Sequence, residues 1–125
     1  MTDADILFRA VYRGDPVTVT HAKDAEIELL AGEVGPTKDT LKLWSIVAIR
    51  YSKATEIHAL GWRRLLENTW ITSPLVAADL AAGSIRTRSG NAYSLGIRDD
   101  KELDPVLRDH LAYALRTWRF DDVRP

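Results

Sequence analysis

The sequence has no cysteine, which excludes disulfide bonds, thiolate metal sites and cysteine nucleophiles together. It also has no apolar run near the roughly 18 residues that a membrane-spanning helix needs. Its opening, MTDADILFRAVYRGD, carries acidic residues where a secretory signal peptide would carry basic ones. These absences predict a cytoplasmic protein that does not associate with a membrane.

The sequence also has no recognisable catalytic or metal-binding motif. The only histidines are His21, His58 and His110, and none is spaced from another as zinc ligands are. No serine lies in the G-x-S-x-G turn of the α/β-hydrolases. We therefore predict no catalytic residue, no metal ligand and no cofactor. A site assembled only in three dimensions would leave no such motif, so an enzyme remains an alternative.

The net charge of −1 hides an uneven distribution along the chain. Residues 1–40 hold eight acids and four bases, a net charge of −4. Residues 41–98 hold three acids and eight bases (+5), and residues 99–125 hold seven acids and five bases (−2). A basic centre can bind polyanions. It can equally be part of a mixed surface, and the mildly acidic pI of about 6.3 favours that interpretation.

Most of the chain has the composition of β-strands, with β-branched and aromatic residues between turn residues. The opening stretch is ambiguous, because Thr2 and Asp5 could also begin a short helix. The alternation of apolar residues with Glu26 and Glu28 predicts a half-exposed strand that ends at Gly32. The strands expected in this part of the chain are 6–13, 17–21, 25–32, 41–51 and 55–63.

Residues 70–96 are predicted to form a three-stranded meander. Its first strand, 70–80, must bend at Pro74, because proline cannot donate to a strand ladder. Turns at 81–83 and 89–91 then separate strands 84–88 and 92–96. The stretch R-T-R-S-G could instead be an anion-binding loop, but no helix follows it directly, so turn chemistry explains it better.

The C-terminal region is predicted to be an amphipathic helix over residues 104–119. Asp104 suits the N-cap and Pro105 the first helical position. The residues that form its apolar stripe are Leu103, Val106, Leu107, Leu111, Ala114, Leu115 and Trp118. We expect this stripe to pack on a sheet; a partner's groove or a dimer seam is the alternative. Residues 121–125 are expected to be a frayed tail.

These patterns together predict a single α+β domain over residues 1–125. The sheet is expected to be mostly antiparallel, or a small barrel-like meander, with the C-terminal helix packed on it.

Tryptophan and arginine gather in two neighbouring parts of the sequence. These residue types are enriched at binding hot spots, and they also stack on unpaired bases. Arg86 and Arg88 are two apart on one expected strand, so they should share a face. We call the predicted partner-binding residues the Trp–Arg set: Trp62, Arg63, Arg64, Trp70, Arg86 and Arg88.

The run W-I-T-S-P-L-V-x-x-D-x-x-x-G-x-x-R-T-R-S-G-x-x-Y-x-L-G, residues 70–96, covers about a fifth of the chain. It resembles a segment found in small uncharacterised accessory proteins of proteobacteria and of their phages and plasmids. The resemblance carries no known catalytic residue. It implies an accessory or mobile-element gene, for which small inhibitors and adaptors are frequent products.

Three functions follow as hypotheses. The first is a non-enzymatic protein-binding module, such as an inhibitor, an anti-defence (anti-CRISPR-like) factor or an adaptor, with a homodimer as a further candidate assembly. The second is a single-stranded nucleic-acid or nucleotide binder that uses the same face. The third is a small enzyme, which would need a concave pocket with a perturbed acid or histidine.

Overall fold

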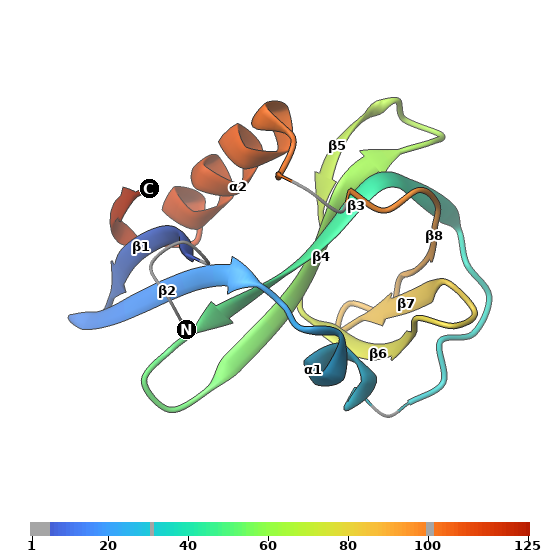
Figure 1. Ribbon diagram of the computed structural model, residues 1–125, viewed down its shortest axis with the longest axis horizontal. Helices are drawn as coiled ribbons and strands as arrows, with labels where there is room; N and C mark the ends of the chain where they lie inside the picture. The colour runs from blue at the N-terminus through green and yellow to red at the C-terminus, as the bar shows by residue number, and fades with distance from the viewer. Residues whose placement is uncertain (1–5, 31, 100–101) are drawn as a thin grey trace.

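The computed structural model describes residues 6–30, 32–99 and 102–125 and has an α+β fold with one open sheet (Figure 1). The possible helix start at Thr2 and Asp5 lies outside the described residues. The elements in chain order are β1 (Ile6–Tyr12), β2 (Asp15–His21), α1 (Asp24–Glu28), β3 (Asp39–Arg50), β4 (Thr55–Arg63), β5 (Asn68–Ile71), β6 (Leu75–Asp79), β7 (Ser84–Thr87), β8 (Ala92–Leu95), α2 (Pro105–Thr117) and β9 (Asp121–Arg124).

The strand β3 joins the parts of the sheet. One of its edges pairs with β4 from Leu41 to Arg50. Its other edge is shared, because Asp39–Leu41 pair in parallel with β8 and Val47–Arg50 pair antiparallel with β2. Between these two pairings the β3–β4 register shifts and Leu43 adopts a φ of 48°, as expected of a β-bulge. The full order is β6-β7-β8-β3-β2-β1-β9, with β4 added on β3 and β5 added on β4.

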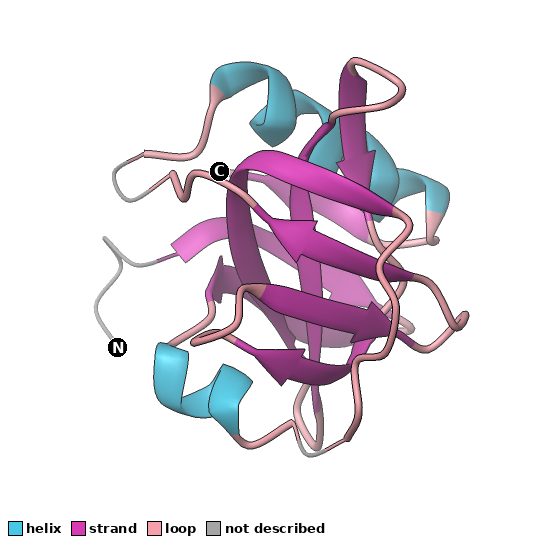
Figure 2. Ribbon diagram, turned by 90° about the vertical axis from the view of Figure 1, so that its right-hand side faces the viewer, coloured by secondary structure: helices cyan, strands magenta, loops and turns pink. Residues whose placement is uncertain are grey.

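The two faces of the β3–β4 pair support two different hydrophobic cores. Val47 and Ile49 belong to the first core, with α2, β1 and β2, whereas Ile46 and Ala48 belong to the second core, with α1 and β6–β8. This split follows from the strand geometry, since successive side chains point to opposite faces. The two helices accordingly lie on opposite sides of the crossing strands, as both ribbon views show (Figures 1 and 2).

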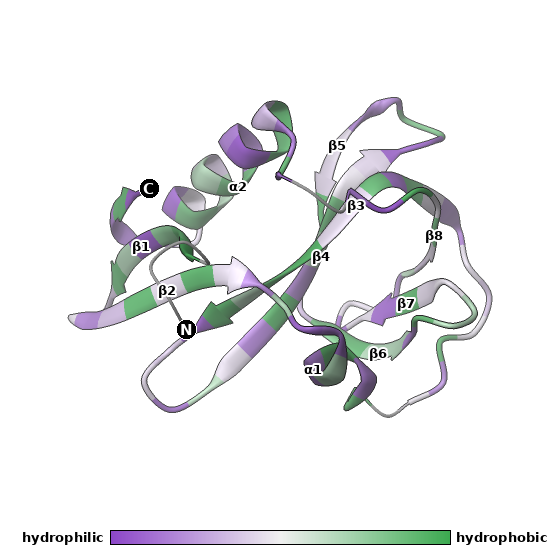
Figure 3. Ribbon diagram, viewed as in Figure 1, coloured by the Kyte–Doolittle hydropathy of each residue, from purple (hydrophilic) through white to green (hydrophobic). Residues whose placement is uncertain are grey.

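The C-terminal helix is confirmed as α2, packed on the sheet. The Asp104 carboxylate accepts a hydrogen bond from the Val106 N–H at 2.8 Å, and Pro105 is the first helical residue, as the capping pattern predicts. Leu107, Leu111 and Leu115 are fully buried in the first core. Hydrophobic and hydrophilic bands therefore alternate along this helix (Figure 3). No helix in the described part of the chain is long and apolar enough to cross a membrane.

The strand predicted over 25–32 is wrong, because Asp24–Glu28 form the helix α1. The Glu26 side chain accepts a hydrogen bond from the Lys23 N–H at 3.0 Å, which caps the first turn. Its two carboxylate oxygens also accept hydrogen bonds from Arg50 at 2.7 and 2.8 Å. The Arg50 hydrogen bonds hold the pKa of Glu26 at about 2, although partial burial opposes them. A local cap and a distant arginine thus both hold Glu26 in a segment whose apolar alternation favours a strand.

Two further predictions need correction. Pro74 does not bend one strand over 70–80 but separates two: β5 pairs with β4, and β6 begins the β6–β7–β8 meander. The meander therefore starts at Leu75 rather than at Trp70. The tail is not frayed either, since β9 pairs with β1 at the far end of the sheet. Because the sheet is open, the barrel-like alternative is also wrong.

Candidate ligand pocket

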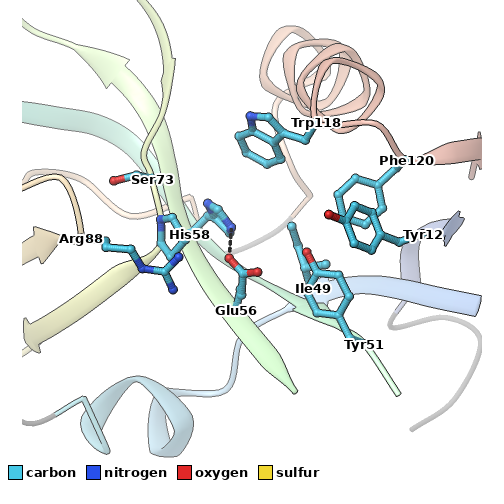
Figure 4. A pocket seen from close by; sticks show the side chains of 10 residues that line it. Tyr12, Ile49, Tyr51, Glu56, His58, Ser73, Arg88, Trp118 and Phe120 are labelled. Carbon is cyan, nitrogen blue, oxygen red and sulfur yellow. Dashed lines mark ion pairs between the residues drawn. The ribbon is translucent and has the colours of Figure 1, made fainter. Parts of the chain in front are cut away.

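A pocket of about 290 Å³ lies at the boundary between the part of the protein built on the first core and the part built on the second core. One side comes from the first core and α2, and the other comes from β4 and the turn after β7. Its lining residues are Tyr12, Ile49, Tyr51, Glu56, His58, Ser73, Pro74, Arg88, Trp118 and Phe120. We call it the aromatic pocket. In Figure 4, Tyr12, Tyr51 and Phe120 lie on one side, Arg88 and Ser73 on the other, and Glu56 and His58 between them.

Three rings on one side of the pocket pack against each other. The ring centroid of Tyr12 lies 4.8 Å from that of Phe120 and 5.6 Å from that of Tyr51. Tyr51 and Phe120 are 5.9 Å apart. Such tilted and edge contacts stabilise aromatic clusters by about 0.5–1.5 kcal/mol each. The contacts bring together the end of β1, the residue after β3 and the chain after α2.

His58 lies on β4, and its environment fixes both of its ring nitrogens. Nδ1 lies 2.8 Å from the Thr72 carbonyl oxygen, so the neutral ring donates its N–H there and leaves Nε2 as an acceptor. Trp118 stacks on the imidazole at 5.0 Å with an interplanar angle of 25°. Burial lowers the pKa of His58, although the Thr72 hydrogen bond and the Glu56 charge act in the opposite direction. The imidazole is therefore neutral at pH 7.

Glu56 brings a carboxylate to the same pocket. Its Oε2 lies 3.8 Å from His58 Nε2, and its side chain is 32% exposed. Burial, the charge of Glu56 and a hydrogen bond to Glu56 raise the pKa of Tyr51 above its ordinary value. Tyr51 therefore keeps its hydroxyl proton. In the described part of the chain, no lysine or arginine forms an ion pair with Glu56.

Arg88 reaches the pocket because the turn after β7 is hydrogen-bonded to the chain after β5. The Arg88 N–H donates to the Pro74 carbonyl at 2.7 Å. The hydroxyls of Ser73 and Ser89 are 3.0 Å apart, and the Ser89 hydroxyl is also 2.9 Å from that of Thr87. The stretch R-T-R-S-G is thus a turn, as expected, and it places one arginine at the pocket.

The Trp–Arg set does not form one surface. Arg63 and Trp70 do meet, since the guanidinium lies 4.7 Å from the Trp70 ring centroid. However, Arg63 is buried and forms an ion pair with Asp39 at 2.8 Å. This pair and its rings lie on the side of the second core, whereas Trp62 packs against the first core.

The other members of the set are also spread out. Trp62 lines a separate apolar hollow of about 790 Å³ that includes Leu43 and Ile97. Arg64 is exposed in the turn after β4, and Arg86 is half-buried on β7. Because β7 ends at Thr87, Arg88 belongs to the turn rather than to the strand. Of the six residues, only Arg88 lines the aromatic pocket. A role of the set in binding a partner stays a prediction.

The uneven charge of the sequence has a structural explanation. Three arginines of the basic centre pair with acids from the N-terminal part of the chain: Arg50 with Glu26, Arg63 with Asp39, and Arg98 with Asp24. Part of the basic centre is thereby neutralised inside the molecule and does not face a polyanion.

Sequence reasoning missed most of the aromatic pocket. The sequence patterns mark none of Tyr12, Tyr51, Glu56 and Phe120 as a binding residue. Their only common signal is that each lies at the end of an expected element, where chains from different parts of a fold can converge. Comparison with protein-family profiles, with curated protein sequences and with solved structures finds no match to this chain.

Proposed function

We propose that the protein is a binding module whose site is the aromatic pocket and whose ligand group is an organic cation. The observation that carries this proposal is the Glu56 carboxylate, which lines a pocket with four aromatic rings. Within the described residues, no lysine or arginine lies close enough to form an ion pair with it.

The physical basis is the attraction between a cation and both kinds of group. Aromatic faces carry a negative quadrupole that attracts a cation within about 6 Å, and the attraction grows when water is excluded. A partly buried carboxylate adds a full charge that favours a positive neighbour. His58 supplies none, because burial lowers its pKa and leaves it neutral. A bound cation would give the Glu56 carboxylate an ion-pair partner.

The size of the pocket limits the ligand group. Its volume of about 290 Å³ lies at the lower end of the roughly 300–1,000 Å³ range of small-molecule sites. It suits a side chain or a small metabolite. A lysine, methyl-lysine or arginine side chain of a partner would make the protein the protein-binding module that the sequence predicts. A free quaternary ammonium ion is the other source of the same chemistry.

Titration with choline, followed by the NMR signals of the Trp118 indole and the Ile49 methyl groups, tests the proposal. 3,3-Dimethylbutan-1-ol has the same shape as choline but no charge, and we expect it to bind at least about tenfold more weakly. Peptides with trimethyl-lysine, lysine or arginine, titrated in parallel, separate a side chain from a free cation.

Glu56→Gln removes the charge and keeps the shape, so we expect it to weaken choline binding about tenfold. Glu67→Gln is the matched control, because Glu67 is exposed and lines the other hollow. If the uncharged alcohol binds as tightly as choline, or if Glu56→Gln binds choline normally, the pocket does not select a cation and the proposal fails.

The enzyme and nucleic-acid hypotheses stay predictions. The pocket does hold a histidine with a lowered pKa, which the enzyme hypothesis requires. However, the Ser73 hydroxyl bonds to Ser89, and in the described part of the chain no hydroxyl group is hydrogen-bonded to His58. The geometry therefore supports binding better than nucleophilic catalysis.

A further inference from the structure

The aromatic pocket contains a second charged side chain, and a ligand that carries only a positive charge would form no favourable contact with it. The Arg88 side chain lines the same pocket as Glu56, yet the two form no ion pair. The backbone of Arg88 is held at Pro74 by a 2.7 Å hydrogen bond. Its position is therefore set by the turn and not by contact with the Glu56 carboxylate.

Arg88 also differs from three other arginines of the central region. Arg50, Arg63 and Arg98 each bond to an acidic side chain at 2.7–2.8 Å. Within residues 6–30, 32–99 and 102–125, the Arg88 guanidinium has no acidic partner. Its charge does act on the pocket, since it contributes to the lowered pKa of His58. A free guanidinium at a pocket is a donor for a carboxylate or phosphate.

We propose that the pocket binds a small zwitterion, with its onium group among the aromatic rings at Glu56 and its anionic group on Arg88. This inference rests on the proposed function, because it assumes that the Glu56 end takes a cation.

The charges decide between the ligand classes. A ligand with only a positive charge is attracted by Glu56 and repelled by Arg88. A ligand with only a negative charge is attracted by Arg88 and repelled by Glu56. A ligand with both charges gains from both residues, because each of its ends meets the opposite charge. The chemical class is therefore a compact onium compound with a carboxylate or phosphate a few bonds away, such as a betaine, an amino acid or phosphocholine.

Four ligands of nearly equal shape test the inference on the intact protein by isothermal titration calorimetry. Glycine betaine carries both charges and choline only the positive one. 3,3-Dimethylbutanoate has the shape of betaine without its positive charge, and 3,3-dimethylbutan-1-ol is the uncharged form of choline. We expect betaine to bind about tenfold more tightly than choline and than 3,3-dimethylbutanoate. Phosphocholine, titrated alongside betaine, shows whether Arg88 prefers phosphate or carboxylate.

Two variants assign the anionic end. Arg88→Met replaces the aliphatic part of the side chain and removes the charged guanidinium, and we expect it to weaken betaine binding about tenfold while choline binding stays equal or improves. Arg86→Met is the matched control, because Arg86 does not line the pocket. Both variants should keep the melting temperature of the wild type, which a thermal scan checks.

Different results would overturn zwitterion binding and cation binding. If choline binds but betaine binds no more tightly, or if Arg88→Met changes the affinity for both ligands equally, the zwitterion inference is overturned and cation binding stands. If neither onium compound binds while the protein is folded, the proposed function itself is overturned, and the zwitterion inference with it.

Discussion

Arg63 Nε lies 2.8 Å from Asp39 Oδ2, and the Asp39 side chain is only 1% exposed. Burial alone would raise the pKa of Asp39, but hydrogen bonds from Arg63, Thr40 and Leu65 hold that pKa below its ordinary value. The guanidinium also lies 4.7 Å from the ring centroid of Trp70. Arg63, which the sequence predicts as a partner-binding residue, thus links β4 to the start of β3.

Asp39→Asn leaves the Arg63 charge buried without a counter-ion, so we expect the free energy of unfolding to fall by about 3–5 kcal/mol. Urea denaturation measures the loss. Asp24→Asn is the matched control, because the Arg98–Asp24 pair is 35% and 56% exposed and such surface pairs contribute about 0–1 kcal/mol. Equal effects of the two substitutions would mean that the Asp39–Arg63 pair does not stabilise the fold.

Leu111→Ala should destabilise the protein by about 2–5 kcal/mol, because the Leu111 side chain is fully buried in the first core and its loss leaves a cavity. Tyr113→Ala lies on the same helix but replaces a side chain that is 67% exposed. It should change stability by about 0.5 kcal/mol or less. Thermal and urea unfolding of both variants would contradict the packing of α2 if the two losses were similar.

Gly61→Ala tests the close approach of β4 to the bulge in β3. A Cβ at Gly61 would lie 3.0 Å from the Lys42 carbonyl oxygen and 3.3 Å from the Trp44 Cα. Because both contacts are backbone atoms, the strands must separate, and we expect a loss of about 1–3 kcal/mol. Thr55→Ala, at an exposed position of the same strand, should be nearly neutral. A stable Gly61→Ala protein would show that the bulge can move freely.

His58 should make stability depend on pH in one direction. Its folded pKa is lowered, chiefly by burial, from the ordinary value of 6.5, so the unfolded chain takes up the proton first. Its contribution is therefore complete above pH 6.5 and is lost as the pH falls through the folded pKa. NMR titration of the imidazole and unfolding curves at several pH values measure both effects. In Glu56→Gln the pKa should fall further, because Glu56 acts to raise it; a folded pKa above 6.5 would reverse the sign.

Much of the fold could be predicted from local patterns. The strands expected at 41–51 and 55–63 correspond to β3 and β4, and the helix expected at 104–119 corresponds to α2. These elements are long, and their composition and caps agree with the structure that they adopt. The antiparallel pairing of β7 with β8 also followed from the turn at Ser89–Asn91.

The errors occur where a distant part of the chain decides the structure. Glu26 lies in a helix where its carboxylate also accepts hydrogen bonds from Arg50, and β9 pairs with the edge of β1. The pocket has the same origin, since Tyr12, Tyr51 and Phe120 come from separate elements and meet only through the sheet order. No pattern within a short window carries this information.

The position of the pocket at the meeting of two cores limits how the protein can be divided. The wall with Trp118 and Phe120 comes from one half, and the wall with Pro74 and Arg88 comes from the other. Both halves also need the same two central strands, since β3 and β4 contribute alternate residues to each core. A fragment or a chimaera that replaces the residues of either core would therefore lose one wall of the pocket, so the pocket requires the intact fold.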